Sequence, residues 1–271
     1  MTDLRVAIAG AGGRMGAANL RAVAATPGLI VHSAFDRPDS ATIGRDAGDL
    51  AGIGPLGVVV GGDAEAALVG ADALIDFTAP AVSVFLSELA GARRLIHIIG
   101  TTGCSREEDW SIQKAGSAGA RIVKAGNFSL GVNLLLGLVR QAARALPGFD
   151  IEIVEMHHNK KVDAPSGTAL MLGQAAADGR GIDLDNHSVR SRDGHTGARV
   201  PGSIGFQALR GGAVVGDHTV MFAGDTERIE ITHRAQDRGM FAAGAVQAVL
   251  WAADQPAGFY DMADVLGLKE K

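Results

Sequence analysis

The hydrophobic pattern in the first half of the chain alternates between short apolar runs and helix-forming stretches. The first apolar run, at residues 6–9, leads into a glycine-rich turn and then into a helix-forming stretch at 17–25. Further apolar runs lie at 29–35, 58–60, 73–77, 95–99 and 120–123. Strands that alternate with helices in this way predict an α/β domain with a Rossmann-like, doubly wound parallel sheet.

The residues that begin two of these helices support the pattern. Pro80 suits the first turn of a helix, because its fixed φ angle is already helical and its missing N–H would have no partner there. Ser105 is followed three residues later by Glu108, which predicts a capping box at the start of another helix. Both helix starts follow an apolar run, as the strand–helix alternation requires.

The pattern changes after about residue 128. Residues 130–146 are a long helix candidate, and residues 150–156 alternate as a half-buried strand does. We expect Ile151 and Ile153 to lie on the core side of this strand. The acidic side chains set against them are Asp150, Glu152 and Glu155.

Two more apolar runs, 203–209 and 214–222, flank Gly211-Gly212, which predicts a hairpin turn. Residues 227–233 alternate as another strand. We therefore expect a second α+β domain with a mixed, mainly antiparallel sheet and one open face. A last helix candidate at 239–253 could return the chain to the first domain.

These patterns divide the chain into two domains. Residues 1–128 and 239–271 form the expected dinucleotide-binding domain, and residues 129–238 form the expected substrate-binding domain. A chain of 271 residues is long enough for two modest domains that each bury a core. The sequence shows no internal repeat and no low-complexity linker.

Composition and charge narrow the function classes. A net charge of −5 and a pI near 5.9 argue against nucleic acid as the main partner. The single cysteine, Cys104, excludes an intramolecular disulfide and a cysteine-rich metal site, and it fits a reducing compartment. The first five residues lead directly into a strand without a secretory signal, and no long apolar stretch predicts a membrane span. We expect a cytoplasmic protein.

The first strand–helix junction carries a glycine-rich loop. Glycines at 10, 13 and 16 give G-x-x-G-x-x-G, although the strict G-x-G-x-x-G pattern would need glycine in place of Met15. Such glycines let backbone N–H groups approach a pyrophosphate at the start of the helix. The loop follows a strand, opens a helix and is followed by an acidic residue after strand two, so it predicts dinucleotide binding over a merely structural turn.

Asp36 and Arg37, at the end of the second strand, bear on which dinucleotide binds. A carboxylate there can accept hydrogen bonds from the ribose hydroxyls of NAD, and an adjacent arginine can pair with the 2′-phosphate of NADP. The pair predicts use of both cofactors. The alternative is an exposed charged turn before Pro38. The loops at 100–102 and 125–128 also follow strands and could contact the nicotinamide half, although such loops are often ordinary turns.

The segment from His157 to Thr168 is the most unusual in the chain. It places two histidines and two lysines within five residues, ahead of a Pro-Ser-Gly-Thr turn and a helical run. Ser166 is a suitable N-cap, and the N–H groups near Gly167 would favour a bound carboxylate. Histidine and lysine can donate protons. The segment therefore predicts a site for a small anionic substrate that must be protonated.

Simpler explanations of these residues stay open at this point. Adjacent histidines could bind a metal, but no third ligand is evident nearby, so no metal is expected. The segment could also be a solvated basic loop. Cys104 is interpreted as an incidental thiol. Four scattered histidines are interpreted as structural or surface residues: His187, His195, His218 and His233.

Taken together, these residues resemble the 4-hydroxy-tetrahydrodipicolinate reductase family, long called dihydrodipicolinate reductases, of diaminopimelate and lysine biosynthesis. The resemblance runs from the first strand almost to the end of the chain, and the block from Glu155 to Ala169 is highly specific to that family. The other matching stretches are 6–16, 75–78, 100–103, 127–133, 202–206 and 216–218.

The resemblance implies an NADH- or NADPH-dependent oxidoreductase acting on a CH–CH group. It would reduce (2S,4S)-4-hydroxy-2,3,4,5-tetrahydrodipicolinate to tetrahydrodipicolinate with loss of water, by hydride transfer to ring C4. His157 would be the general acid and Lys161 a second proton donor. The residues implied to bind this dicarboxylate are His158, Ser166, Gly167 and Thr168.

The family resemblance also assigns the cofactor site and the assembly. The residues implied to hold the cofactor are Gly10, Ala11, Gly12, Gly13, Arg14, Met15, Asp36, Arg37, Gly100, Thr101, Thr102, Ala125, Gly126, Asn127 and Phe128. A homotetramer built through the sheet of the second domain is implied, which makes residues 129–238 an oligomerisation domain as well.

Two other functions compete with this interpretation. A dehydrogenase acting on an amino-acid semialdehyde could share the first domain, but the histidine–lysine segment argues against it. A dinucleotide-sensing protein would be expected to lose the proton donors, yet His157 and Lys161 are present. Oxidation of NADH on addition of the substrate would separate these alternatives.

Overall fold

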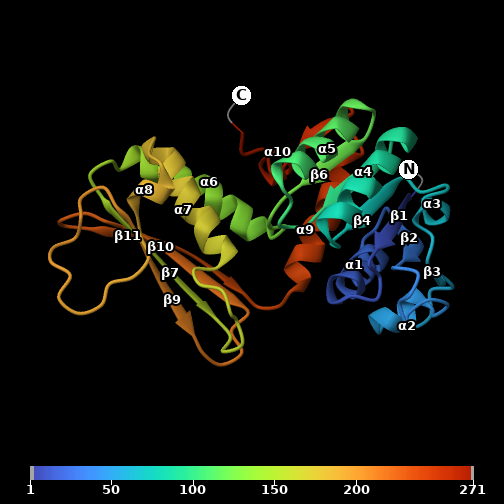
Figure 1. Cartoon of the computed structure of the whole chain (residues 1–271), viewed down its shortest axis with the longest axis horizontal. Helices are drawn as coiled ribbons and strands as arrows, with labels where there is room; N and C mark the ends of the chain where they lie inside the picture. Colours follow the sequence, from blue (N-terminus) through green and yellow to red (C-terminus); the bar gives the residue numbers. More distant parts are fainter. Residues whose placement is uncertain (1–2, 270–271) are drawn as a thin grey trace. The chain divides into compact units, whose positions relative to one another are not determined.

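The structure is a computed structural model that describes residues 3–269, and it divides the chain into two units (Figure 1). The first unit contains the described residues up to Leu130 and those from Gly239 onward. The second unit runs from Gly131 to Arg238. The division thus falls two residues after the boundary expected at 128.

The sheet of the first unit has seven strands in the order β12-β6-β5-β4-β1-β2-β3, and every pairing is parallel. The six strands in the order 6-5-4-1-2-3 confirm the predicted doubly wound arrangement. The short strand β12 at the edge was not predicted. The strands are β1 (Leu4–Ala9), β2 (Leu29–Phe35), β3 (Val60–Gly61), β4 (Ala73–Asp76), β5 (Ile96–Ile99), β6 (Arg121–Lys124) and β12 (Gly258–Tyr260).

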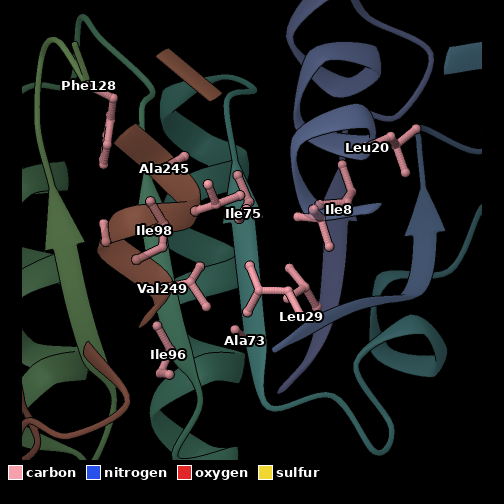
Figure 2. Close-up of a cluster of buried hydrophobic side chains, with 14 of the residues drawn as sticks. Ile8, Leu20, Leu29, Ala73, Ile75, Ile96, Ile98, Phe128, Ala245 and Val249 are labelled. Atoms are coloured by element: carbon pink, nitrogen blue, oxygen red, sulfur yellow. The ribbon is translucent and has the colours of Figure 1, made fainter. Parts of the chain in front are cut away.

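Helices cover both faces of this sheet, so alternate side chains of a strand enter different cores. Ile8 of β1 packs on one face with Leu20 of α1 and Val249 of α9 (Figure 2). Its neighbour Ala7 packs on the other face with Leu86 of α4. The helices of this unit are α1 (Arg14–Ala25), α2 (Ala47–Ala51), α3 (Ala64–Ala67), α4 (Pro80–Arg93), α5 (Arg106–Ser117), α9 (Gly239–Ala252) and α10 (Met262–Val265).

The predicted helix starts are confirmed. Pro80 is the first residue of α4. Ser105 caps α5, since its hydroxyl accepts a 3.2 Å hydrogen bond from Glu108 N while Glu108 Oε2 accepts one of 2.7 Å from Ser105 N. No helix among residues 3–269 is long and apolar enough to cross a membrane.

The second unit is a five-stranded mixed sheet with helices packed on one face, as predicted. Its strand order is β11-β10-β7-β9-β8, antiparallel on the β10 side of β7 and parallel on the β9 side. Ile153 of β7 lies between Val220 and Phe206, and all three are buried under α6 and α7. The elements are α6 (Leu130–Ala145), β7 (Asp150–His157), α7 (Gly167–Arg180), α8 (Leu184–His187), β8 (Ser188–Val189), β9 (Ile204–Arg210), β10 (Gly216–Ala223) and β11 (Arg228–Ala235).

The hairpin predicted around Gly211-Gly212 is wrong. β9 and β10 do not pair with each other, because β7 lies between them and bonds to both. The connecting loop instead passes the end of β7, where Gly211 N donates to His157 O and His158 N donates to Val214 O. The glycines allow the chain to turn, but the two strands that the turn connects cannot pair because β7 lies between them.

The expected outward position of Glu155 is also wrong. Glu155 follows Ile151 and Ile153 at even spacing, and its side chain is only 1% exposed. Alternation along a strand puts residues i, i+2 and i+4 on one face, so Glu155 shares the face of the two isoleucines. Asp150 and Glu152 lie on the opposite face, as expected.

Candidate active site

The loop between β1 and α1 approaches its neighbours too closely for side chains. A Cβ on Gly12 would lie 2.6 Å from Asp36 Oδ2, and one on Gly16 would overlap the carbonyl oxygen of Gly10. Helix α1 has no side-chain cap and no acidic residue in its first turn. A helix N-terminus without a side-chain cap can bind an anion through its backbone N–H groups. The loop therefore fits the pyrophosphate of a dinucleotide.

Asp36 and Arg37 lie at the end of β2, beside this loop. Asp36 Oδ2 accepts a 2.9 Å hydrogen bond from Gly12 N, and Oδ1 accepts one of 2.8 Å from Arg37 N. The Arg37 side chain is exposed and pairs with Asp39 at 3.2 Å. The structure thus places a carboxylate and an exposed arginine at the edge of the glycine-rich loop.

Thr101, in the loop after β5, is held by a buried polar network. Its side-chain oxygen accepts a 3.0 Å hydrogen bond from Thr78 N and lies 2.7 Å from Ser83 Oγ. Ser83 also donates to Asp76, which is fully buried at the end of β4 and accepts from the Thr78 hydroxyl at 2.6 Å. This network fixes the loops after β4 and β5 against each other. Gly100 and Thr102 flank the buried Thr101.

The loop after β6 divides into an accessible part and a buried part. Ala125 and Gly126 line a cavity of about 440 Å³ whose wall includes Lys124 and Trp110. Phe128 is 1% exposed and packs against Phe77, with ring centroids 5.5 Å apart. The side chain of Phe128 therefore belongs to the core. The buried Asn127 accepts a 2.8 Å hydrogen bond from Ser129 N.

In the second unit, β7 carries the chain to the histidine pair. His157 is the last residue of the strand, and its Nδ1 lies 2.6 Å from Glu155 Oε2. His158 and Asn159 are held by the 211–214 loop, because His158 N donates to Val214 O and Asn159 N to Gly212 O. The proposed acid His157 thus lies at the end of β7, which is hydrogen-bonded to β9 on one side and to β10 on the other.

Lys161 lies four residues beyond His157 and is paired with Asp163. Its Nζ donates to both carboxylate oxygens of Asp163, at 2.8 and 2.9 Å. The hydrogen bond from Lys161 is the main cause that lowers the pKa of Asp163. The Lys161 side chain is 20% exposed.

Ser166 begins α7, as predicted. Its hydroxyl accepts a 3.2 Å hydrogen bond from Ala169 N and lies 2.9 Å from His218 Nε2. Gly167 is exposed and Thr168 is half-buried at the first turn of the helix. With no acidic residue in that turn, α7 offers N–H groups to a carboxylate. The Glu155 carboxylate links His157 to this helix start, because it lies 2.6 Å from His157 Nδ1 and accepts a 3.1 Å hydrogen bond from Ser166 N.

Three functional candidates were not found from the sequence. Glu155 bonds to His157, Arg210 pairs with Glu155 at 2.8 Å, and His218 contacts both Ser166 and the ring of His157. Burial and then the charge of His157 lower the pKa of His218 from 6.5 to about 4. The sequence could have predicted that Glu155 is buried, since it follows Ile151 and Ile153 at intervals of two residues along the strand. Arg210 and His218 lie on β9 and β10, and only the sheet brings them here.

The surroundings of Cys104 and of the histidine pair bear on thiol reactivity and on metal binding. Cys104 is half-buried, and burial is the main cause that raises the pKa of its thiol, which disfavours the reactive thiolate. Among residues 3–269, no group of three or more histidine, cysteine, aspartate or glutamate side chains is arranged to hold a metal ion. His158 Nδ1 instead accepts a 3.2 Å hydrogen bond from Lys160 N.

Comparison with protein families gives two matches that together cover most of the chain. The family described as dihydrodipicolinate reductase, N-terminus, matches residues 4–128, and that described as dihydrodipicolinate reductase, C-terminus, matches residues 131–266. The first match contains the glycine-rich loop, and the second contains the histidine–lysine segment.

Curated proteins with similar sequences share one name, 4-hydroxy-tetrahydrodipicolinate reductase. The protein from Rhizobium rhizogenes is 57% identical over 270 residues, covering 99% of this chain and 98% of its own. Those from Allorhizobium ampelinum and Rhodopseudomonas palustris are 58% identical over 267 residues and 56% identical over 271 residues. They cover 98% and 100% of this chain, and 98% and 100% of their own lengths.

Solved structures show the same fold at lower identity. A dipicolinate-bound dihydrodipicolinate reductase from Paenisporosarcina sp. TG-14 superposes with a TM-score of 0.78 at 23% identity, covering 96% of this chain and 98% of its own. GenD2 from gentamicin A biosynthesis, in complex with NAD, gives 0.60 at 16% identity, with coverages of 94% and 86%. These two comparisons support the arrangement of the elements.

Proposed function

The chain belongs to the dihydrodipicolinate reductase family, and from this premise we propose how its residues carry out the reduction of 4-hydroxy-tetrahydrodipicolinate to tetrahydrodipicolinate with loss of water. The observation that supports this proposal is that one segment places a histidine, a lysine and a first helical turn without acidic side chains together in the second unit. The segment lies within the region matched by the family. This combination suits a small dicarboxylate that must be protonated.

A nicotinamide cofactor fits the first unit. Backbone N–H groups at the start of α1 would hold the pyrophosphate, and Asp36 would accept hydrogen bonds from the adenosine ribose. The nicotinamide supplies the hydride when bound. Asp36 with the exposed Arg37 supports use of either NADH or NADPH, because the first suits a ribose diol and the second a 2′-phosphate.

The second unit would bind the substrate through its two carboxylates. The first turn of α7, at Gly167 and Thr168, offers N–H donors and the positive end of a helix dipole. Lys161 offers a partly exposed ammonium group that now pairs with Asp163. A carboxylate of the substrate would compete with Asp163 for Lys161. His158 is half-buried beside this segment and supplies a further polar contact.

His157 and Lys161 would supply the proton. Loss of water from the substrate conjugates a ring carbon–carbon double bond to the imine. Hydride addition at C4 then moves an electron pair toward the ring nitrogen, and protonation of the neighbouring ring carbon restores the imine. The balance is one hydride and one proton added and one water lost. His157 suits this role because its Nδ1 is hydrogen-bonded to Glu155, which leaves Nε2 to transfer the proton.

The decisive experiment is a steady-state assay with freshly generated 4-hydroxy-tetrahydrodipicolinate and either NADH or NADPH. We expect oxidation of both cofactors that depends on the substrate. An amino-acid semialdehyde should give no oxidation. Intact NADH binding without any oxidation would contradict the proposal and favour a dinucleotide sensor.

Assembly and location complete the proposal. We expect a homotetramer formed through the second sheet, on the face opposite α6 and α7, where Val154, Thr219 and Met221 are half-buried and Thr232 is exposed. Analytical ultracentrifugation tests this expectation, and a monomer would contradict it. A chain with the single cysteine Cys104 suits the reducing cytoplasm, which is where we expect the protein to act.

A further inference from the structure

We propose that Glu155 is a positioning residue of this reaction, whose carboxylate holds the proton donor His157 and the cap of helix α7 in one arrangement. Three contacts of this side chain carry the inference: the ring of His157, the guanidinium of Arg210 and the backbone N–H of Ser166. The role rests on the proposed function, because it assumes that His157 delivers the proton.

The carboxylate of Glu155 is buried and fully engaged. Its side chain is 1% exposed. Oε2 accepts hydrogen bonds from His157 Nδ1 at 2.6 Å and from Arg210 Nη1 at 2.8 Å. Oε1 accepts from Arg210 Nη2 at 2.8 Å and from Ser166 N at 3.1 Å. A buried charge needs such partners, since an unpaired one is strongly destabilising.

The charge state of Glu155 decides which nitrogen of His157 carries the proton. Burial alone would raise the pKa of Glu155, but hydrogen bonds and charges of Arg210 and His157 hold that pKa below its ordinary value. An ionised carboxylate only accepts hydrogen bonds, so His157 Nδ1 must be the donor. Nε2 is then the position that exchanges its proton, as in other carboxylate–histidine pairs.

Neighbouring residues restrict the orientation of the His157 ring. Gly216 is a glycine where a Cβ would approach His157 Nε2 to 2.9 Å. The ring of His218 packs edge-on against that of His157, with centroids 5.1 Å apart. With Nδ1 bonded to Glu155, the ring is fixed by three different strands: β7, β9 through Arg210, and β10. Such fixing is what proton transfer in a defined direction requires.

The same carboxylate ties down the start of the substrate-binding helix. Ser166, which caps α7, donates its backbone N–H to Glu155 and contacts His218 through its hydroxyl. Arg210 Nη2 also donates to the carbonyl oxygen of Asp163 at 2.6 Å, so the loop before the helix is held as well. Loss of the Glu155 charge should therefore disturb proton delivery first and substrate binding second.

Glu152 provides a matched comparison three residues earlier on the same strand. It also pairs with arginines, accepting bonds of 2.9 and 2.7 Å from Arg192 and one of 2.9 Å from Arg199. These arginines lie in the loop after β8, and Glu152 faces away from the Ile153 core. Its hydrogen bonds join it to these two arginines, whereas those of Glu155 include His157. Removing the Glu152 charge therefore shows the effect of losing carboxylate–arginine bonds without the loss of a bond to His157.

The test compares Glu155→Gln, Glu155→Asp and Glu152→Gln in the full-length protein by steady-state kinetics with NADH and 4-hydroxy-tetrahydrodipicolinate. We expect Glu155→Gln to lower kcat by about 100-fold or more, with a smaller rise in KM and an unchanged Kd for NADH. Glu155→Asp should restore part of kcat, because it keeps the charge. Glu152→Gln should keep kcat within about twofold even if it lowers Tm.

A spectroscopic readout separates positioning from general stability. Nitrogen-15 NMR of the histidine rings should show His157 protonated at Nδ1 in the unsubstituted protein and mixed between tautomers in Glu155→Gln. Wild-type kcat in Glu155→Gln, or an unchanged His157 ring signal, would overturn the proposal. If the unsubstituted protein does not oxidise NADH, the proposed function fails, while the ring signal still decides whether Glu155 fixes His157.

A folding failure would not end the test. Glu155→Gln leaves Arg210 without its buried partner, so it could unfold the second unit. The double variant Glu155→Gln/Arg210→Gln removes both charges together, and the same kinetics and NMR apply to it. A folded double variant with wild-type kcat overturns the role, and one with the loss described above supports it.

Discussion

The sites of the two units are built from different parts of the polypeptide. The loop between β1 and α1 is formed by backbone, and its glycines are needed because neighbouring atoms leave no room for Cβ. The site at the end of β7 is formed by side chains, with Glu155, Arg210 and His218 contributed by three strands. We propose that the first site offers N–H groups to a phosphate, whereas the second holds the ionised Glu155–Arg210 pair in a fixed position.

This difference predicts different weaknesses. A backbone site tolerates changes of surface charge but not added atoms, because close packing leaves no space for them. A site of buried charges tolerates little change of charge, since each partner left alone keeps its desolvation cost without compensation. The substitutions below test this contrast, in order of decreasing expected effect.

The largest effect should come from the two residues proposed as proton donors. His157→Ala and Lys161→Ala should each lower kcat by about 10²–10⁴-fold, the usual contribution of general acid–base catalysis. Both residues belong to the second unit, so the Kd for NADH should stay nearly unchanged in a fluorescence titration. Lys160→Ala removes a neighbouring exposed lysine and should keep kcat within a few-fold. Full activity of either proton-donor variant would refute the assignment.

The next effect concerns stability at acid pH. The native unit keeps His218 neutral with a pKa of about 4, while the unfolded chain titrates near 6.5. Unfolding therefore takes up a proton as the pH falls from about 6.5 to about 4. The stability present above pH 6.5 is lost over that window, by at most about 3–4 kcal/mol.

His218→Gln should flatten this pH dependence, measured as the free energy of urea unfolding between about pH 7 and pH 4. His195→Gln changes an exposed histidine and is the matched control, with an expected slope equal to that of the unsubstituted protein. An unchanged slope in the His218 variant would show that burial of this ring does not govern the acid response.

Gly16→Ala tests the backbone site. The added Cβ would overlap the Gly10 carbonyl oxygen, so α1 must shift away from β1. We expect a loss of about 1–3 kcal/mol in the stability of the first unit and at least tenfold weaker NADH binding. Gly61→Ala is the control, because a Cβ there would meet no atom within 4 Å. Equal behaviour of the two variants in thermal unfolding and NADH titration would contradict the backbone interpretation.

The smallest effect should come from the one acidic side chain expected at the cofactor site. Asp36→Ala should raise KM for NADH by about tenfold, the value of one or two hydrogen bonds to a charged group. KM for NADPH should rise less, because Arg37 would still pair with its phosphate. Asp39→Ala removes the present partner of Arg37 without touching the loop and should leave KM for NADH unchanged. Equal rises for both cofactors would argue against the role of Asp36.

Local spacing explains what was predictable. The strand–helix alternation, the capping box of Ser105 and the N-cap at Ser166 involve residues close in sequence, and the structure has each of them as expected. The hairpin at Gly211 was not predictable in the same way, because β7 occupies the place between β9 and β10. Turn residues show where a chain can bend, but pairing partners are chosen by the whole sheet.

Periodicity and spacing are properties of consecutive residues, so the Rossmann-like sheet, the glycine-rich loop and the histidine–lysine segment were predictable from the sequence. The spacing from Ile151 and Ile153 indicates that Glu155 is buried, but only the packed structure brings it Arg210 from β9 and Ser166 from the start of α7. The physical reason is that burial of a charge is stable only where distant segments supply its partners, and the packed sheet brings them together.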